Sequence, residues 1–396
     1  MPLHEQLLGR PDPLFEADLR ANADALRDAI EGQRLLVLGG AGSIGGAVAK
    51  KLFSYKPEAL HVVDLSENNL AELVRDIRSS MGYIKGDFHA YCLDVLDPEF
   101  IAMVSAQPKP YDAVLNFAAL KHVRSEKDPY TLMRMIRVNV LGVARAVDAA
   151  RKGGARLFGV STDKASNPIN AMGATKRIME QTMMRVADEL TVTSARFANV
   201  LFSDGSLPFA WKYRLEKGQP IVAPRDIKRY FVTDREAASL CLLALSAGKS
   251  RDVLFPKLDA GVNELSFSEL AIRYLESRGL TPQLCDDEEE ARTLAAKGPT
   301  PGEWPCYFFD SDTTGEKDRE VFYEDHETVD MDRFAHAGVV RSIADGDIHS
   351  LEHFFKEIQK FSDQGAWDKP TLVSLLQQTL KTFSHDERHK YLDERM

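Results

Sequence analysis

The chain has few of the features that mark secreted, membrane or redox-active proteins. Only four of its 396 residues are cysteines (Cys92, Cys241, Cys285 and Cys306), and they form no CxxC pair of the kind found in zinc and redox motifs. The most apolar stretch, residues 237–247, is much shorter than the roughly 20 residues that span a bilayer. The N-terminus has no secretory core. We therefore expect no membrane span and no metal site.

The charge balance excludes another class of protein. Fifty basic and 60 acidic side chains give a net charge of −10, so the basic surplus that is typical of a nucleic-acid binder is missing. The composition, 44% hydrophobic and 28% charged, is that of a globular protein. We therefore predict a cytoplasmic protein that binds a small molecule and no nucleic acid.

Short apolar runs alternate with longer amphipathic stretches from Arg34 to about residue 200. The runs are RLLVLGG, ALHVVDL, FHAYCLD, DAVLNFAA, ARLFGVST and TVTSARFANV. Strands separated by helical patterns are typical of parallel βαβ units, with a sheet that is covered on both faces. We predict an α/β fold, a Rossmann-type doubly wound parallel sheet with a smaller, mixed α/β lobe toward the C-terminus.

The length predicts two to three units. We expect an N-terminal helical extension (1–30), a dinucleotide-binding Rossmann domain (31–198), a substrate lobe partly interleaved with it (199–345), and a C-terminal helical extension (346–396). Loops are expected to dominate after residue 199, and the acidic run at 285–292 to be a solvated face. Apolar residues of the first extension recur at helical spacing and are expected to dock on the body of the protein: Leu14, Phe15, Leu19, Ala23, Leu26 and Ile30.

A glycine-rich loop, LGGAGSIGG, follows the first expected strand and precedes a helical pattern. It fits GxGxxG through Gly40 and also GxxGxxG through Gly39. A dinucleotide pyrophosphate needs glycines here because it must approach backbone amides at the start of the helix, where a β-carbon would block it. An ordinary tight turn would explain the glycines alone, but the strand before and the helix after them favour dinucleotide binding. The residues expected to contact the cofactor are Gly39, Gly42, Ser43, Ile44 and Gly45.

Acidic residues at the next two strand ends extend this prediction. Asp64 follows Gly45 by 64 − 45 = 19 residues, close to the spacing of a carboxylate that binds the adenosine ribose. A carboxylate repels the 2′-phosphate of NADP, and no Lys or Arg follows in LSENN, so NAD is favoured over NADP. Asp94 and Val95 would lie beside the adenine, although a solvated strand-end carboxylate explains Asp94 equally well.

Two further strands end in residues that suit a binding site, because ligands of open α/β sheets bind beyond the carboxyl ends of the strands. In the first, NFAALKHV, the small Ala118 and Ala119 would let the cofactor lie against the chain. Lys121 and His122 follow, and a surface lysine or a structural histidine is an equally good explanation of them. The second strand ends in GVSTDK.

A helix is expected to begin near Met172, after the loop that contains Pro168. Met172 and Lys176 are four residues apart and would project from one face of that helix. A lysine pointed back at the sheet can hold the nicotinamide ribose and lower the pKa of neighbouring hydroxyls. On spacing alone, an exposed helix lysine explains Lys176 better.

These segments together resemble one family. GGAGSIG, NFAALKHV, STDKASNPINAMGATK, RFANVLFSDGS, KRYFVT and SDTTGEK, in this order, look like the extended short-chain dehydrogenase/reductase superfamily. More narrowly, they resemble the capsular-polysaccharide-type UDP-N-acetylglucosamine 4,6-dehydratases. The resemblance covers about residues 34–340. The insertion at residues 299–309 has no counterpart that we can place.

The resemblance implies a reaction and roles for four residues. In such enzymes NAD oxidises C4 of the sugar, water is eliminated across C5 and C6, and the hydride returns to C6. The O4 proton would leave through Thr162, with an ordered water linked to Lys176. Lys164 would remove the C5 proton, and Asp163 would protonate the departing C6 hydroxyl. Adjacent opposite charges favour the reverse protonation of Asp163 and Lys164, so these two roles can be distributed differently.

One position departs from the superfamily pattern. The usual Tyr-x-x-x-Lys is Met172-x-x-x-Lys176 here, and a thioether cannot accept the proton that the tyrosine takes. The chain is similar in this respect to a subgroup of the dehydratases that carries Met and retains the configuration at C5. Loss of the tyrosine would also fit a non-catalytic NAD-binding scaffold.

The resemblance also implies the substrate side of the site. Asn199 matches an asparagine that binds the substrate diphosphate, and Ser206 and Arg229 match residues that contact phosphate and nucleotide, with Lys228 as a weaker candidate. The turn at residues 315–317 would cap the site. A UDP-linked sugar is the expected substrate, a homo-oligomer (a dimer or larger) is the expected assembly, and a nucleotide-sugar C4 epimerase is the alternative function.

Overall fold

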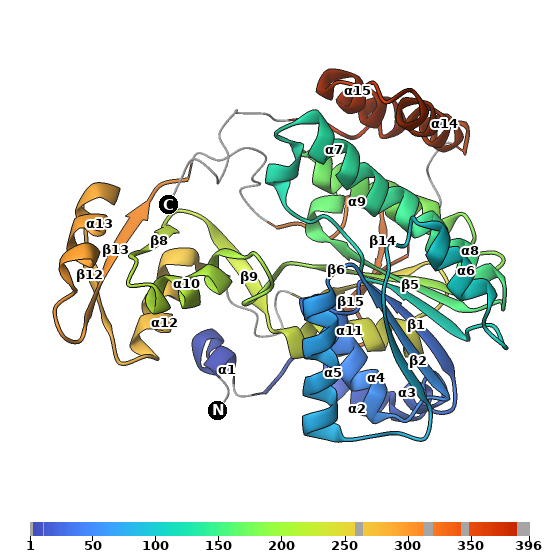
Figure 1. Ribbon diagram of the computed structural model, residues 1–396, viewed down its shortest axis with the longest axis horizontal. Coiled ribbons are helices and arrows are strands. Elements are labelled where there is room, and N and C mark those ends of the chain that lie inside the picture. The colour runs from blue at the N-terminus through green and yellow to red at the C-terminus, as the bar shows by residue number, and fades with distance from the viewer. Residues whose placement is uncertain (1–2, 11, 258–263, 312–319, 342–347, 386–396) are drawn as a thin grey trace.

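A nine-stranded sheet forms the centre of the protein (Figure 1). The computed structural model describes residues 3–10, 12–257, 264–311, 320–341 and 348–385. In spatial order the strands are β14 (Thr328–Asp330), β15 (Ala337–Arg341), β10 (Asp252–Pro256), β6 (Val192–Phe197), β5 (Arg156–Thr162), β4 (Ala113–Asn116), β1 (Arg34–Leu38), β2 (Ala59–Asp64) and β3 (Asp87–Cys92). The strands from β10 to β3 are parallel, and β15 and β14 are antiparallel. The predicted doubly wound α/β fold is confirmed.

Helices cover both faces of this sheet. One face carries α2 (Glu16–Ala21), α3 (Ala23–Asp28), α4 (Ser43–Ser54), α5 (Glu67–Met81) and α11 (Asp234–Ala247). The other carries α6 (Pro98–Ser105), α9 (Ala171–Met184), and a continuous run of α7 (Pro129–Ile136), the π-helix η2 (Arg137–Leu141) and α8 (Gly142–Arg151). Strand β1 serves both cores, because Leu35 and Val37 pack on the first face and Leu36 and Leu38 on the second.

A smaller lobe is built from two three-stranded sheets and three helices. Its elements are β7 (Asn199–Val200), β8 (Ile221–Pro224), β9 (Lys228–Val232), β11 (Glu264–Ser266), β12 (Thr281–Leu284), β13 (Glu303–Phe309), α10 (Leu207–Glu216), α12 (Phe267–Glu276) and α13 (Glu288–Lys297). The prediction that loops dominate after residue 199 is therefore wrong. The shortest strands, β7 and β11, have only two and three residues and show no period. Helix α11 is buried on all sides from Glu236 to Ser246, so it has no amphipathic pattern.

The N-terminal segment docks on the body as predicted. Helix α1 (Leu3–Leu8) buries Leu7 and Leu8 in the core of the smaller lobe. Five of the six apolar residues that follow are buried under α4 and α11, whereas Ala23, the first residue of α3, is exposed. Arg10 joins the two parts, because its guanidinium donates to Glu236 of α11 and to the Phe231 carbonyl of β9.

Two C-terminal helices, α14 (Ile348–Gln364) and α15 (Lys369–Thr379), lie over α7 and α9 on the outer side of the molecule (Figure 1). Leu351 and Phe354 of α14 share a buried cluster with Leu376 of α15 and with Ile136 and Ile178 from the covered helices. Trp367, between α14 and α15, donates its indole N–H to the Pro129 carbonyl at 3.0 Å. The C-terminal extension thus covers the outer face of the helix that carries Met172 and Lys176.

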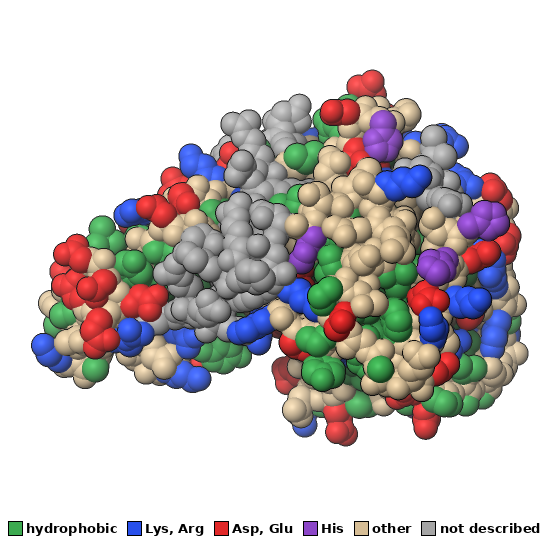
Figure 2. All heavy atoms as spheres, turned by 90° about the horizontal axis from the view of Figure 1, so that it is seen from above, with side chains coloured by type: hydrophobic (Ala, Val, Ile, Leu, Met, Phe, Trp, Pro, Cys, Tyr) green, Lys and Arg blue, Asp and Glu red, His purple; other side chains and the backbone are tan. Residues whose placement is uncertain are grey.

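The acidic run at residues 285–292 forms a solvated face, as predicted. The acidic run at 285–292 is mostly exposed, and acidic side chains gather at the end of the smaller lobe in Figure 2. Within the described part of the chain, no helix has the length and apolar character that a membrane crossing requires.

Candidate functional site

A cavity of about 790 Å³ lies beyond the carboxyl ends of the parallel strands, between the large sheet and the smaller lobe. The chain winds in opposite directions from β1, toward β2 on one side and β4 on the other, which is where open α/β sheets bind ligands. Most of the residues that the sequence singled out line this cavity, although Gly40 and Lys228 do not: Gly39, Gly42, Ser43, Ile44, Gly45, Asp64, Asp94, Val95, Ala118, Ala119, Lys121, His122, Thr162, Asp163, Lys164, Met172, Lys176, Asn199, Ser206 and Arg229. Their individual roles stay predictions.

The glycine loop lies directly against the end of β4. Gly39 has φ of +67°, and a β-carbon on it would lie 2.4 Å from the Ala118 nitrogen, so only glycine fits. The Asp64 carboxylate holds the same region, because it accepts hydrogen bonds from the Ala41 N–H at 3.0 Å and the Ser66 N–H at 2.9 Å. The loop, the small residues after β4 and Asp64 therefore form one continuous wall.

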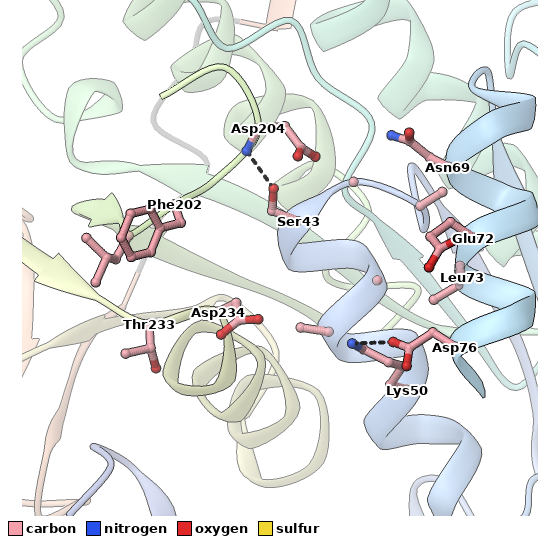
Figure 3. A pocket seen from close by; sticks show the side chains of 15 residues that line it. Ser43, Lys50, Asn69, Glu72, Leu73, Asp76, Phe202, Asp204, Thr233 and Asp234 are labelled. Carbon is pink, nitrogen blue, oxygen red and sulfur yellow. Dashed lines mark hydrogen bonds and ion pairs between the residues drawn. The ribbon is translucent and has the colours of Figure 1, made fainter. Parts of the chain in front are cut away.

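A smaller hollow of about 400 Å³ lies on the other side of the glycine loop (Figure 3). There the Ser43 hydroxyl accepts a hydrogen bond from the Asp204 N–H at 2.8 Å, and Lys50 pairs with Asp76 at 2.9 Å. The first contact ties the loop that carries Ser206 to the first residue of α4. The glycine-loop wall of the large cavity and the loop after β7 are thus joined by a hydrogen bond.

Asp94 is not a solvated strand-end carboxylate. Its Oδ2 pairs with Arg134 of α7 at 2.7 Å, and its Oδ1 accepts from the Leu96 N–H at 2.9 Å. The side chain lines the cavity, beside Val95.

The turn after β5 brings three polar side chains together. Thr162 Oγ1 donates to Asp163 Oδ1 at 2.8 Å, and Lys164 Nζ lies 3.5 Å from the same oxygen. Asp163 is buried, whereas Lys164 is partly open to the cavity. The acid and the base that the resemblance implies are therefore in direct contact.

Helix α9 begins immediately after this turn. Asn170 caps it by accepting a hydrogen bond from the Gly173 N–H at 2.8 Å. Lys176 is buried and points at the sheet, where its Nζ donates to the Val160 carbonyl of β5 at 2.9 Å. Burial lowers the pKa of Lys176 to about 8, although the charge of Glu180 opposes this shift. Met172 presents only a thioether to the cavity.

Cationic side chains line the part of the cavity formed by β9 and the loop after β4. Arg229 of β9 is buried and lines the cavity, whereas the neighbouring Lys228 is exposed and does not. The loss of water around His122 lowers its pKa, and the positive charges of Lys121 and Arg124 lower it further. A region of this sign suits the phosphates of a nucleotide sugar.

Sequence reasoning missed several residues of the site. Glu320 lines the cavity and is buried, but no spacing or motif points to it. Asn139 of η2 fixes the loop after β4, because its amide pairs with both the N–H and the carbonyl of Leu120 and donates to Thr175 of α9. Phe309, in the insertion that we could not place, also lines the cavity. The turn at residues 315–317 lies outside the described residues.

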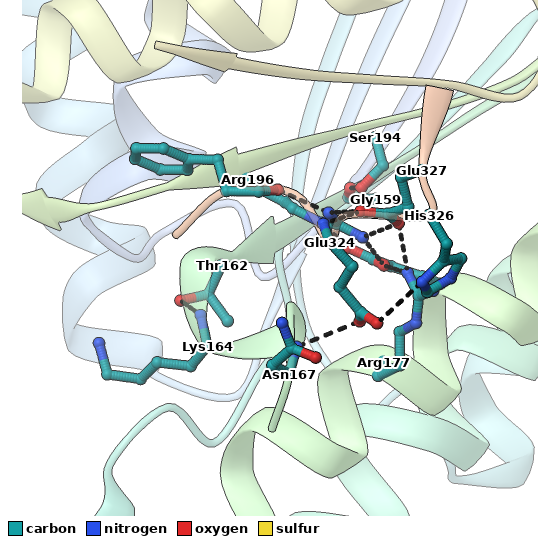
Figure 4. A network of polar contacts seen from close by, with 12 residues as sticks. Gly159, Thr162, Lys164, Asn167, Arg177, Ser194, Arg196, Glu324, His326 and Glu327 are labelled. Carbon is teal, nitrogen blue, oxygen red and sulfur yellow. Dashed lines mark hydrogen bonds and ion pairs between the residues drawn. The ribbon is translucent and has the colours of Figure 1, made fainter. Parts of the chain in front are cut away.

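A buried ionic network lies beside the Thr162–Lys164 turn (Figure 4). Arg196 of β6 makes paired hydrogen bonds with Glu180 of α9 and with Glu327, and Arg177 contacts both carboxylates. Burial alone would raise the pKa of Glu180, but the charge and hydrogen bonds of Arg196 lower it to about 2.

Two hydrogen bonds from backbone N–H groups connect this network to the loop after the Thr162–Lys164 turn. The Glu327 carboxylate accepts from the Glu324 N–H, and the Glu324 carboxylate accepts from the Asn167 N–H at 3.1 Å. Asn167 has a left-handed φ of +44°. The network therefore fixes the chain between the Thr162–Lys164 turn and α9.

The family model and similar relatives both point to polysaccharide biosynthesis proteins. Residues 35–306 match the model of a family described as polysaccharide biosynthesis protein. The chain is 32% identical over 305 residues to the capsular polysaccharide biosynthesis protein CapD of Staphylococcus aureus, which covers 76% of this chain and 47% of CapD. It is 27% identical over 238 residues to a UDP-N-acetylglucosamine 4,6-dehydratase (inverting) of Campylobacter jejuni, which covers 57% of this chain and 67% of that protein.

The fold is also similar to a solved structure, that of DesIV, a dTDP-glucose 4,6-dehydratase from Streptomyces venezuelae with NAD and TYD bound. The TM-score is 0.53 at 19% identity, and the match covers 72% of this chain and 87% of that one. The chain spans about half the length of CapD.

Proposed function

The chain belongs to this family of polysaccharide biosynthesis proteins, and from that premise we propose that it is an NAD-dependent nucleotide-sugar 4,6-dehydratase. Its substrate would be UDP-N-acetylglucosamine or a close analogue, and its product a 4-keto-6-deoxy sugar nucleotide. The observation that carries the proposal is the contact among Thr162, Asp163 and Lys164 in the same cavity wall as Lys176. The relative from Campylobacter jejuni supports both the reaction and the substrate class.

The residues present fit a dinucleotide cofactor. At Gly39 and Gly45 a β-carbon would collide with neighbouring backbone, so glycine lets the loop turn tightly into α4, where its backbone amides would hold a pyrophosphate. Asp64 lines the cavity where the adenosine ribose would lie, and its negative charge favours NAD over NADP. NAD bound in DesIV supports this cofactor class. The nicotinamide would accept the hydride from C4 and return it to C6.

The chain's own residues would then move the protons. The Thr162 hydroxyl, with Lys176 nearby, would take the O4 proton and pass its own to Asp163, to which it donates, as C4 becomes a ketone. The ketone makes the C5 hydrogen acidic, and Lys164 would remove it. Asp163 would give a proton to the C6 hydroxyl, which leaves as water, and a proton would be restored at C5. The sum is loss of one water with no net oxidation.

Met172 stands where the superfamily has tyrosine, and it takes no proton in this scheme. Its thioether would instead exclude water beside the nicotinamide. We propose that the product keeps the configuration of the substrate at C5, as in the Met-bearing subgroup that this chain resembles.

The test is to incubate the purified protein with UDP-N-acetylglucosamine and to measure the mass of the product by mass spectrometry. A product lighter by one water is expected. A C4 epimerase would yield a product of unchanged mass and altered configuration at C4, and a scaffold would yield no product while still holding NAD. Sugar nucleotides with other bases in the same assay define the substrate range.

A further inference from the structure

Glu320 is a buried carboxyl group in the cavity wall that no proposed role uses. Only 6% of its surface is exposed. Its Oε2 accepts a hydrogen bond from the Tyr230 N–H at 2.8 Å, and its Oε1 lies 2.6 Å from Asn199 Nδ2. No ion pair joins it to any cation in the described part of the chain, so its charge would be poorly compensated.

The surroundings favour the neutral form of this group. Burial raises the pKa of Glu320, and the negative charge of Asp163 raises it further. Lys164, Arg229 and the Tyr230 N–H act in the opposite direction, and the resulting pKa is about 8. At neutral pH Glu320 is therefore mostly a carboxylic acid, which has a proton to donate.

The contact with Asn199 suits such a donor. A separation of 2.6 Å is at the short end for an amide N–H···O bond but common for an O–H···O bond, whose usual range is about 2.5–3.0 Å. An asparagine amide keeps its shape when it turns over, so Asn199 can present either its nitrogen or its oxygen to Glu320. With a protonated Glu320, the acid donates to Asn199 Oδ1, and both hydrogens on Nδ2 are then available to the cavity.

We propose that Glu320, as a neutral acid, is a positioning residue that turns the amide nitrogen of Asn199 toward the diphosphate of the substrate. The inference rests on the proposed function, in which Asn199 binds that diphosphate. An ionised Glu320 would instead hold the Asn199 N–H itself and would add a negative charge beside the phosphates. Diphosphate binding should therefore weaken as Glu320 loses its proton.

The variant Glu320→Gln tests this directly. A glutamine donates from its amide to Asn199 Oδ1 and accepts from the Tyr230 N–H with its carbonyl, so it imitates the protonated acid at every pH. The probe is UDP, titrated into the NAD-loaded protein by calorimetry between about pH 7 and pH 9.5. Phosphate groups with a second pKa near about 6 are fully ionised over most of this range, and the uracil N3–H, which ionises toward its upper end, does so equally for both proteins.

The wild-type affinity should fall above about pH 8, approaching tenfold per pH unit, and Glu320→Gln should keep its pH 7 affinity to higher pH. Burial also lowers the pKa values of Lys176 and Lys121 in this cavity, so the difference between the two proteins is the readout. Equal pH dependence in both proteins, or weak binding by Glu320→Gln already at pH 7, would overturn the inference.

A second variant keeps the test decisive if Glu320→Gln does not fold. Asn199→Ala should bind UDP weakly and with a shallower decline above about pH 8, because the amide that Glu320 positions is gone and only the negative charge of Glu320 still acts on the phosphates. A decline as steep as that of the wild type would contradict the inference. UDP that fails to bind the wild-type protein at pH 7 would instead remove the proposed substrate class, and with it this inference.

Discussion

Gly173 lies so close to Lys164 that a β-carbon on the glycine would be 2.2 Å from the Lys164 carbonyl oxygen. The first turn of α9 is therefore packed directly on the turn that carries Thr162, Asp163 and Lys164. This close approach sets the position of Met172 and Lys176 relative to the three polar residues. The two halves of the candidate site are thus joined by backbone packing.

The variant Gly173→Ala should separate these halves. The added methyl group must push the Lys164 backbone away, and overpacking of this kind costs about 1–3 kcal/mol. We expect a lower melting temperature and a fall in kcat of about tenfold or more, because the reacting groups move apart. Gly46→Ala is the matched control, since a β-carbon there meets nothing closer than 3.7 Å. Equal activity of the two variants would contradict this account.

How much the sequence predicts depends on how local the signal is. The parallel strands, the glycine loop and the cavity-lining residues of β1, β2, β4 and β5 were predictable, because each depends on a short run with its own period or motif. The smaller lobe was not, because its strands are as short as the two residues of β7.

Long-range contacts account for the rest of what was missed. Glu320 of the site contacts Asn199, which is 121 residues away in the chain. The network around Arg196, with its link from Glu324 to Asn167, joins residues up to 157 positions apart, and no spacing reveals such a pairing. The same holds for the docking of α14 and α15 on α7 and α9: the amphipathic pattern predicted the helices but not the surface that they cover.

Lys164→Ala should abolish turnover while NAD stays bound, because Lys164 is the proposed C5 base and is not among the residues expected to contact the cofactor. General base catalysis contributes about 10²- to 10⁴-fold, so kcat should fall by at least 10². The measurement is product formation together with the NAD released on denaturation. Lys109→Ala, at an exposed lysine that pairs with Glu58, is the control. An active Lys164→Ala enzyme would assign the base role elsewhere.

Met172→Leu should keep kcat within several-fold of the wild type, because an apolar side chain of similar volume replaces one that takes no proton. Lys176→Met, four residues along the same helix, should lower kcat by about 10² or more, because the amine at Val160 is lost. Comparing kcat and KM for the two variants checks both expectations. A large loss of kcat in Met172→Leu would show that the thioether has a chemical role.

Glu327→Ala should destabilise the fold by about 3 kcal/mol, because it leaves the fully buried Arg196 and the buried Arg177 short of a carboxylate. The free energy of unfolding in urea measures this. Asp310→Ala removes an ion pair of similar length, 2.8 Å, at the surface, where its loss should be within error. Similar losses for the two variants would contradict the role assigned to burial.

The most direct test of the central claim follows the hydride. UDP-N-acetylglucosamine that carries deuterium at C4 should yield a product with the deuterium at C6 of the same molecule, because the hydride removed from C4 is returned two carbons away. Mixing labelled and unlabelled substrate shows whether the transfer is intramolecular. Deuterium that stays at C4 without loss of water, or that is lost to solvent, would contradict the proposed dehydratase reaction.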